Sequence, residues 1–223
     1  MSLHLGSIRG TTIDVDPSFF FLVGFFVLTN YDPQQPRNAL LWIPVVFISI
    51  LVHELAHAAA NGTFGFGPSR VLLGGMGGVT INERRARPWQ DMLIAFAGPA
   101  ASFLLWWGCL QLAMKVPAVQ HDPMLVALMP LMIWANLAWG IFNLLPISPL
   151  DGGHVLRNFL RIILPEKPAF LISVWSGMIL GGLLALWWFS HMMFFAGVLM
   201  AWFVRMNFAQ WQIYRAYQRP GDE

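Results

Sequence analysis

The sequence predicts an all-α polytopic membrane protein with about six transmembrane helices and a small β-sheet element on the cytoplasmic side. Of its 223 residues, 57% are hydrophobic and only 11% are charged, a composition too apolar for an ordinary soluble domain. Long apolar stretches and a biased distribution of Lys and Arg support the same class. We expect one membrane-embedded domain that occupies residues 1–223.

The amino-terminal segment is polar. Residues 2–16 alternate around Arg9 and Gly10 and predict two short strands joined by a turn. They contain no apolar core followed by a small-residue cleavage site, so we expect no cleavable signal peptide.

Six apolar segments follow, measured against about 20 residues per hydrocarbon thickness. The first is short, and the last two are separated by only three residues. The predicted spans are residues 17–29, 39–60, 89–114, 123–145, 168–188 and 192–208.

The basic residues test this count independently. Only Arg37 and Lys115 fall on the predicted outer side. The cytoplasmic segments hold the other eleven: Arg9, Arg70, Arg84, Arg85, Arg87, Arg157, Arg161, Lys167, Arg205, Arg215 and Arg219. This bias predicts an even number of spans with both termini in the cytoplasm. We expect the membrane to be a prokaryotic cytoplasmic membrane. Membrane topology explains how the basic residues are distributed, and the net charge of +2 is small. We therefore expect no nucleic-acid partner.

The second apolar segment contains the pattern H-E-x-x-H. His53 and His57 lie four residues apart, on one face of a helix, where they could share a metal ion. Glu54 lies beside them and could accept a proton from water. Ionisable groups in hydrocarbon are costly unless something binds them, which indicates a functional site. The single cysteine, Cys109, excludes a thiolate cluster, so the ligands must be His, Asp or Glu.

Asp151 is the predicted third ligand. The second and fourth spans run in the same direction, so His57, near the end of one, and Asp151, just after the other, should lie at a similar depth. Two imidazoles and one carboxylate would hold one Zn²⁺ per chain and leave a fourth position for water. An alternative role for Asp151 is to cap the helix that begins at Gly152.

The motifs HELAH (residues 53–57) and NLLPISPLDG (residues 143–152) resemble those of the site-2 protease family of intramembrane zinc metalloproteases. Gly98-Pro99 and the glycine-rich segment GGMGGVTINE (residues 74–83) extend the similarity. The compact layout resembles the branch that contains sporulation-factor processing enzymes, with no room for a PDZ or CBS domain. We therefore expect any regulatory partner to act in trans.

The resemblance implies a role for each matching residue. It assigns zinc binding to His53, His57 and Asp151, the general base to Glu54, and a contact with the substrate or transition state to Asn143. The catalytic core would occupy residues 39–164, with additional helices at 17–29 and 168–208. The chain departs from the family pattern at Ser102, where many members have Asn, so the role of that position stays open.

Three positions have competing interpretations. Asn136 has the same side chain as Asn143 and could equally contact the substrate. Only the family motif favours Asn143 for this role. His154 could ligate a metal, but a fourth protein ligand would close the site to water. Residues 70–83 could form a flexible loop or a strand with an exposed edge.

These features predict a zinc metalloendopeptidase that cleaves membrane-spanning or membrane-associated proteins in the lipid bilayer. The resemblance implies that such cleavage releases a signalling fragment. A helical substrate must unwind, most simply by pairing as a strand with an enzyme edge. Two alternatives are a catalytically silent module that binds transmembrane segments and a divalent-metal transporter. Glu54 argues against the first, and confinement of the ionisable cluster to one depth argues against the second.

Overall fold

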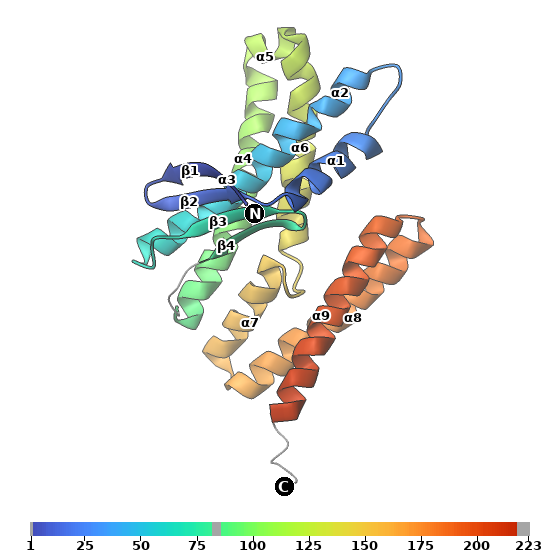
Figure 1. The fold of residues 1–223 in the computed structure, drawn as a ribbon. Coiled ribbons are helices and arrows are strands. Elements are labelled where there is room, and N and C mark those ends of the chain that lie inside the picture. Colours follow the sequence, from blue (N-terminus) through green and yellow to red (C-terminus); the bar gives the residue numbers. More distant parts are fainter. Residues whose placement is uncertain (1, 82–85, 218–223) are drawn as a thin grey trace. The chain divides into compact units, whose positions relative to one another are not determined.

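The computed structural model describes residues 2–81 and 86–217, which are mostly helical with one small β-sheet (Figure 1). The chain divides into two compact units. The first comprises residues 1–86 and 97–141, and the second comprises residues 87–96 and 142–223. Arg84, Arg85 and Arg219 from the predicted charge distribution, and residues 82–83 of the predicted strand segment, lie outside the described residues.

The sheet belongs to the first unit and has four strands in the order β1-β2-β3-β4. The strands are β1 (Leu3–Ile8), β2 (Thr11–Val15), β3 (Arg70–Gly74) and β4 (Gly77–Ile81). Two antiparallel hairpins, β1–β2 and β3–β4, join through a parallel β2–β3 pairing. Both segments predicted to supply strands therefore do so, and β1 and β4 form the two edges.

The alternation of side chains along the central strands β2 and β3 explains which face of the sheet packs against the hydrophobic core. Ile13 is paired with Val71 and Val15 with Leu73, and all four side chains are buried. Side chains on one face of a strand recur every second residue, so these four form one apolar face. Val15, Val71 and Leu73 join the hydrophobic core that also contains Ile50 of α3 (Trp42–Thr63).

Asp14 lies between those buried positions on β2 and is the polar connection between the hairpins. It hydrogen-bonds the His4 ring at 2.8 Å and accepts a hydrogen bond from Arg70 at 2.6 Å. These hydrogen bonds, from His4 and then Arg70, lower the pKa of the Asp14 carboxyl below its usual value. A carboxylate that is ionised in the folded state thus connects β1, β2 and β3.

Nine helices are present in the part of the chain that the structure describes. Besides α3 they are α1 (Ser18–Thr29), α2 (Pro36–Leu40), α4 (Pro88–Lys115), α5 (Pro117–His121), α6 (Pro123–Asn143), α7 (Asp151–Ile163), α8 (Glu166–Ser190) and α9 (Phe194–Tyr217).

Four stretches among the described residues are long and apolar enough to cross a membrane. They are Pro36–Thr63, Pro88–Lys115, Pro123–Asn143 and Glu166–Ser190, and they match the second to fifth predicted spans. The first predicted span corresponds to α1, whose 12 residues extend only about 18 Å against about 30 Å of hydrocarbon. The sixth corresponds to α9, whose second half carries polar residues such as Arg205, Asn207 and Gln210. The protein is thus an integral membrane protein with four candidate spans, and the count of six stays a prediction.

The second unit is built around the α8–α9 hairpin, whose helices lie side by side (Figure 1). Glycines allow this close approach: a Cβ at Gly177 would lie 2.6 Å from Oδ1 of Asn207, and one at Gly181 would lie 2.9 Å from Cγ2 of Val204. Small residues at helix interfaces serve this purpose in membrane proteins. The loop before α7 packs into the hairpin through Ile147, which is completely buried.

Candidate metal centre

Helix α3 carries the three motif residues in a buried position. The side chains of His53, Glu54 and His57 are only 2%, 5% and 7% exposed. The two imidazole rings come from successive turns of the helix, and their centroids lie 4.9 Å apart. The four-residue spacing therefore places both rings on one helical face, as the sequence predicts.

A glycine of α4 makes room for these rings. A Cβ built on Gly98 would lie 2.6 Å from Nε2 of His53 and would collide with Nε2 of His57. Both Nε2 atoms therefore point toward the same spot on α4, and any side chain at position 98 would occupy the space between them. Close backbone approach of this kind is a physical reason for glycine in the Gly98-Pro99 pair.

Ser102 follows Gly98 by one helical turn and reaches the other side of the His53 ring. Its Oγ lies 3.0 Å from Nδ1 of His53, and the serine is completely buried. The position at which the chain departs from the family pattern thus contacts a candidate metal ligand.

Glu54 lies against the edge strand β4. The hydroxyl of Thr80 donates a hydrogen bond to Oε2 of Glu54 at 2.8 Å and lies 3.1 Å from the backbone oxygen of the same residue. A Cβ on Gly78 would lie 2.5 Å from Cδ of Glu54. The glycine-rich hairpin therefore approaches the carboxylate closely, and Thr80 holds it.

Asp151 is the first residue of α7, and its loop is held within the second unit. Ser176 of α8 donates to the Pro146 oxygen at 3.3 Å, and Asn207 of α9 donates to the Ser148 oxygen at 2.6 Å. Gln210 adds a bond of 3.1 Å to the Ser148 hydroxyl. These contacts fix the chain immediately before Asp151.

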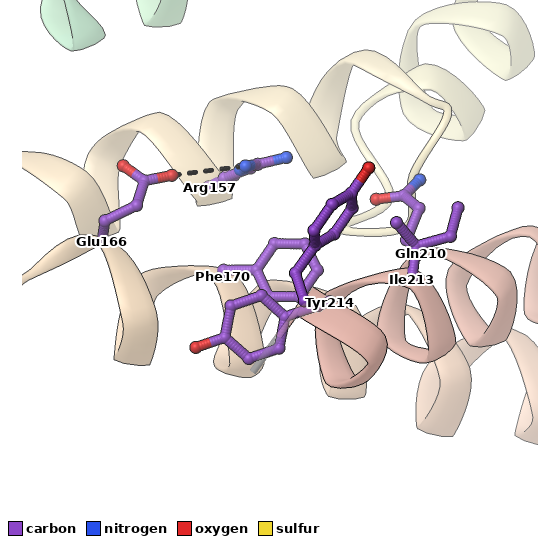
Figure 2. Close-up of a pocket in the computed structure, with 7 residues that line it drawn as sticks. Arg157, Glu166, Phe170, Gln210, Ile213 and Tyr214 are labelled. Atoms are coloured by element: carbon purple, nitrogen blue, oxygen red, sulfur yellow. Dashed lines mark hydrogen bonds and ion pairs between the residues drawn. The ribbon is translucent and has the colours of Figure 1, made fainter. Parts of the chain in front are cut away.

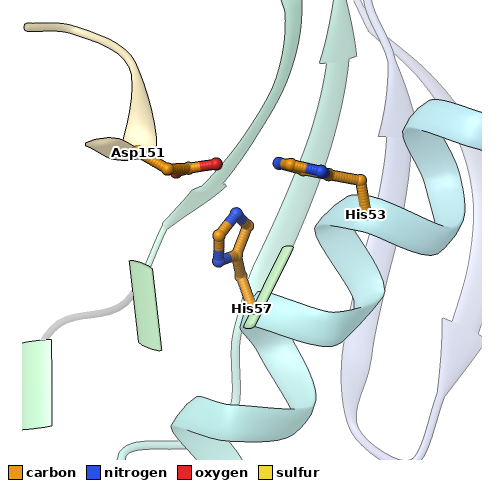
Figure 3. Close-up of side chains that lie close together, drawn as sticks. All are labelled: His53, His57 and Asp151. Atoms are coloured by element: carbon orange, nitrogen blue, oxygen red, sulfur yellow. The ribbon is translucent and has the colours of Figure 1, made fainter. Parts of the chain in front are cut away.

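His53, His57 and Asp151 form the candidate metal site (Figure 3). Each offers one ligand atom, and these atoms lie within 4.8 Å of one another. The donor set fits zinc, which accepts imidazole nitrogen and carboxylate oxygen at about 2.0–2.2 Å. Three protein ligands would leave one tetrahedral position for water or substrate, the arrangement of a catalytic rather than a structural zinc site.

Asn143 is the last residue of α6 and is partly buried. Its competitor Asn136 is completely buried and donates to the Met132 oxygen of its own helix at 2.8 Å. His154 lies one turn after Asp151 and is not a member of the three-residue group found among the described residues. That His154 is not a metal ligand stays a prediction.

Sequence reasoning missed the supporting residues. Ser102 carried a signal, since it follows Gly98 by four residues on one helical face, but its contact with His53 joins residues 49 positions apart. Thr80 lies in a segment considered as a strand or a flexible loop, and that pattern gives no sign of a contact with Glu54. Asn207 carried no signal beyond being polar in an apolar helix.

A separate cavity of about 370 Å³ lies within the second unit (Figure 2). The Arg157–Glu166 ion pair, at 3.3 Å, and the rings of Phe170 and Tyr214, with centroids 4.7 Å apart, lie along it. None of the predicted site residues lines this cavity.

The fold and the site define a class of protein: helical integral membrane proteins whose candidate metal ligands lie among apolar segments. Comparison with known proteins shows which family within this class the chain resembles. A model of Peptidase family M50 matches residues 108–186. Zinc metalloprotease MJ0392 of Methanocaldococcus jannaschii is 30% identical over 189 residues, which cover 83% of this chain and 52% of the relative. Stage IV sporulation protein FB of Bacillus subtilis is 30% identical over 177 residues, which cover 78% of this chain and 57% of the relative.

The solved structure of a site-2 protease from Methanocaldococcus jannaschii matches with a TM-score of 0.63 and 25% identity, over 93% of this chain and 94% of that chain. The chain belongs to the site-2 protease family, peptidase family M50. This confirms the resemblance seen in the HELAH and NLLPISPLDG motifs. The chain spans about half the length of the curated relatives that it matches.

Proposed function

We propose that this protein is an intramembrane zinc endopeptidase that cleaves membrane-spanning or membrane-associated proteins. The observation that carries the proposal is the grouping of His53, His57 and Asp151, with Glu54 adjacent on an apolar helix. One zinc per chain would be held by these three side chains. Residues 1–223 would act as one metalloprotease domain, an idea supported by the nearly complete mutual coverage with the solved site-2 protease.

The chemistry follows from the residue types. Bound zinc supplies Lewis acidity, which makes water more acidic and polarises a peptide carbonyl. Glu54 acts as the general base, taking a proton from the attacking water and passing it to the leaving amine. Thr80 keeps the Glu54 carboxylate in position through its 2.8 Å hydrogen bond. Asn143 donates a hydrogen bond to the carbonyl oxygen as negative charge develops on it.

The substrate would bind as an extended strand along β4. An edge strand presents backbone groups that can pair with an incoming peptide, and pairing would compensate the hydrogen bonds lost when a substrate helix unwinds. β4 is the better of the two edges because it packs on α3, where Thr80 contacts Glu54. The scissile bond would then pass close to the general base.

The proposed setting is a prokaryotic cytoplasmic membrane with six spans, both termini in the cytoplasm and the sheet on the cytoplasmic side. The excess of Lys and Arg in the segments assigned to that side supports this orientation. Cleavage there would release a signalling fragment from the membrane, and regulatory partners would act in trans.

Substitution Glu54→Gln tests the function most directly. It keeps the size of the side chain and removes the base, so cleavage of dye-labelled casein, an unfolded polypeptide able to bind as a strand, should stop. Zinc measured in the detergent-purified, folded protein should stay near one per chain. Asp151→Ala is the matched control, since it should remove zinc and activity together. Casein cleavage by Glu54→Gln at the wild-type rate would contradict the role of Glu54, and folded wild type that binds no zinc would contradict the metalloprotease function.

A further inference from the structure

We propose that Ser102 is a positioning residue that fixes the imidazole of His53 for metal binding, an inference that rests on the proposed zinc-dependent function. Its Oγ lies 3.0 Å from Nδ1 of His53, and both side chains are almost completely buried. Buried polar pairs at this distance are hydrogen-bonded and orient each other.

The geometry leaves one particular ring nitrogen for the metal. With Nδ1 beside Ser102, His53 offers Nε2 to the spot next to Gly98, where Nε2 of His57 also points. A neutral imidazole that binds metal through Nε2 carries its proton on Nδ1. Nδ1–H then donates to the Ser102 oxygen, which fixes both the tautomer and the plane of the ring.

One face of α4 is shaped for this task. Gly98 and Ser102 are four residues apart and therefore project on the same side of the helix. The glycine leaves space at the two Nε2 atoms, and the serine provides an acceptor at Nδ1. Ser102 is small enough to fit a completely buried position while keeping a polar oxygen, which alanine would lack.

A second buried serine provides a control that distinguishes positioning of His53 from the mere burial of a hydroxyl. Ser49 lies one turn before His53 on α3 and is only 3% exposed, yet its Oγ has no hydrogen-bond partner among the residues that the structure describes. Ser49→Ala and Ser102→Ala therefore make the same chemical change at neighbouring buried positions. Only the second removes a contact with a candidate ligand.

The experiment compares zinc affinity in wild type, Ser102→Ala, Ser49→Ala and Ser102→Thr, using full-length detergent-purified protein and a competing chelating dye. Loss of a partner that orients a metal ligand lowers metal affinity about 10- to 100-fold. We expect that loss in Ser102→Ala, wild-type affinity in Ser49→Ala, and recovery in Ser102→Thr, which retains the hydroxyl. Thermal unfolding of the zinc-free proteins should show a cooperative transition in both alanine variants, at a lower temperature in Ser102→Ala, which loses a buried hydrogen bond. The visible absorption of the Co²⁺-loaded protein should change only in Ser102→Ala.

Wild-type zinc affinity in Ser102→Ala would overturn the inference while leaving the proposed function intact. An equal loss of affinity in Ser49→Ala would also overturn it, because the effect would then come from burial of any serine in this region. If Ser102→Thr does not fold, the comparison of the two alanine variants still decides. Folded wild type that binds no zinc would overturn the proposed function and this inference together.

Discussion

Glu54 illustrates how single side chains shape the site. It lies on α3, but the group that orients its carboxylate, the Thr80 hydroxyl, comes from the sheet. The strand can come this close because Gly78 has no side chain. A carboxylate held by a hydroxyl keeps one rotamer, which a general base needs in order to face its water.

Thr80→Val should therefore slow cleavage without removing zinc. The substitution keeps the shape and removes a hydrogen bond to a carboxylate, which is worth about 1.5–3 kcal/mol. At about 1.4 kcal/mol per factor of ten, turnover of casein should fall about 10- to 100-fold. The rate and the zinc content of purified protein check this. Thr80→Ser retains the hydroxyl and should restore most of the rate, and wild-type turnover in Thr80→Val would show that Glu54 needs no such support.

At this scale the sequence predicts the motif residues well, and their supporting contacts poorly. His53 and His57 share a face because a helix repeats every 3.6 residues, which is readable from one segment. The contacts of Ser102 with His53 and of Thr80 with Glu54 depend on how separate elements pack. No local pattern encodes the side-chain distances across such an interface.

The α8–α9 hairpin shows how one element can hold a motif that lies elsewhere in the sequence. Sequence reasoning treated these segments as additional helices, yet Ser176, Asn207 and Gln210 all bond to the loop before Asp151. Asn207 is completely buried, and Ile147 of the loop enters the hairpin core. We infer that the hairpin sets the position of α7 and thereby of Asp151.

Asn207→Leu tests this support. Leucine has a similar shape but leaves the Ser148 oxygen without its 2.6 Å donor, at a cost of about 1–3 kcal/mol. Hydrogen exchange of residues 144–150 should become roughly 5- to 100-fold faster, following that free energy, and zinc should dissociate faster from the purified protein. Ser173→Ala is the control, since the Ser173 hydroxyl bonds to the Phe170 oxygen within α8. Unchanged exchange in Asn207→Leu would mean that packing alone holds the loop.

The sheet is a second case at the scale of elements. Its strands were expected from alternation and glycine content, and the structure confirms both hairpins. The parallel pairing of β2 with β3, which joins segments more than 50 residues apart, was not predicted. Local patterns indicate a strand but not its neighbour, because the register is set by the shared apolar face of Ile13, Val15, Val71 and Leu73.

At the scale of the whole molecule, the charge distribution and the helix lengths support different numbers of membrane spans. The excess of basic residues fits six spans, whereas four of the described stretches are long and apolar enough to cross. The difference concerns α1 and α9. If α1 does not cross, residues 30–35 stay on the same side of the membrane as the amino terminus. Whether these two segments lie on the same side therefore decides whether α1 crosses.

Cysteine labelling in intact cells answers the question. In a Cys109→Ser background, which removes the only native thiol, Gln34→Cys lies in the exposed loop after α1, Ser7→Cys on exposed β1, and Gln212→Cys on an exposed position of α9. With six spans and both termini in the cytoplasm, a membrane-impermeant maleimide should label only Gln34→Cys from outside. Ser7→Cys and Gln212→Cys should react only after permeabilisation. Labelling of Ser7→Cys and Gln34→Cys from the same side of the membrane would mean that α1 does not cross. Labelling of Gln212→Cys from outside, with Gln34→Cys outside and Ser7→Cys inside, would mean that α9 does not cross.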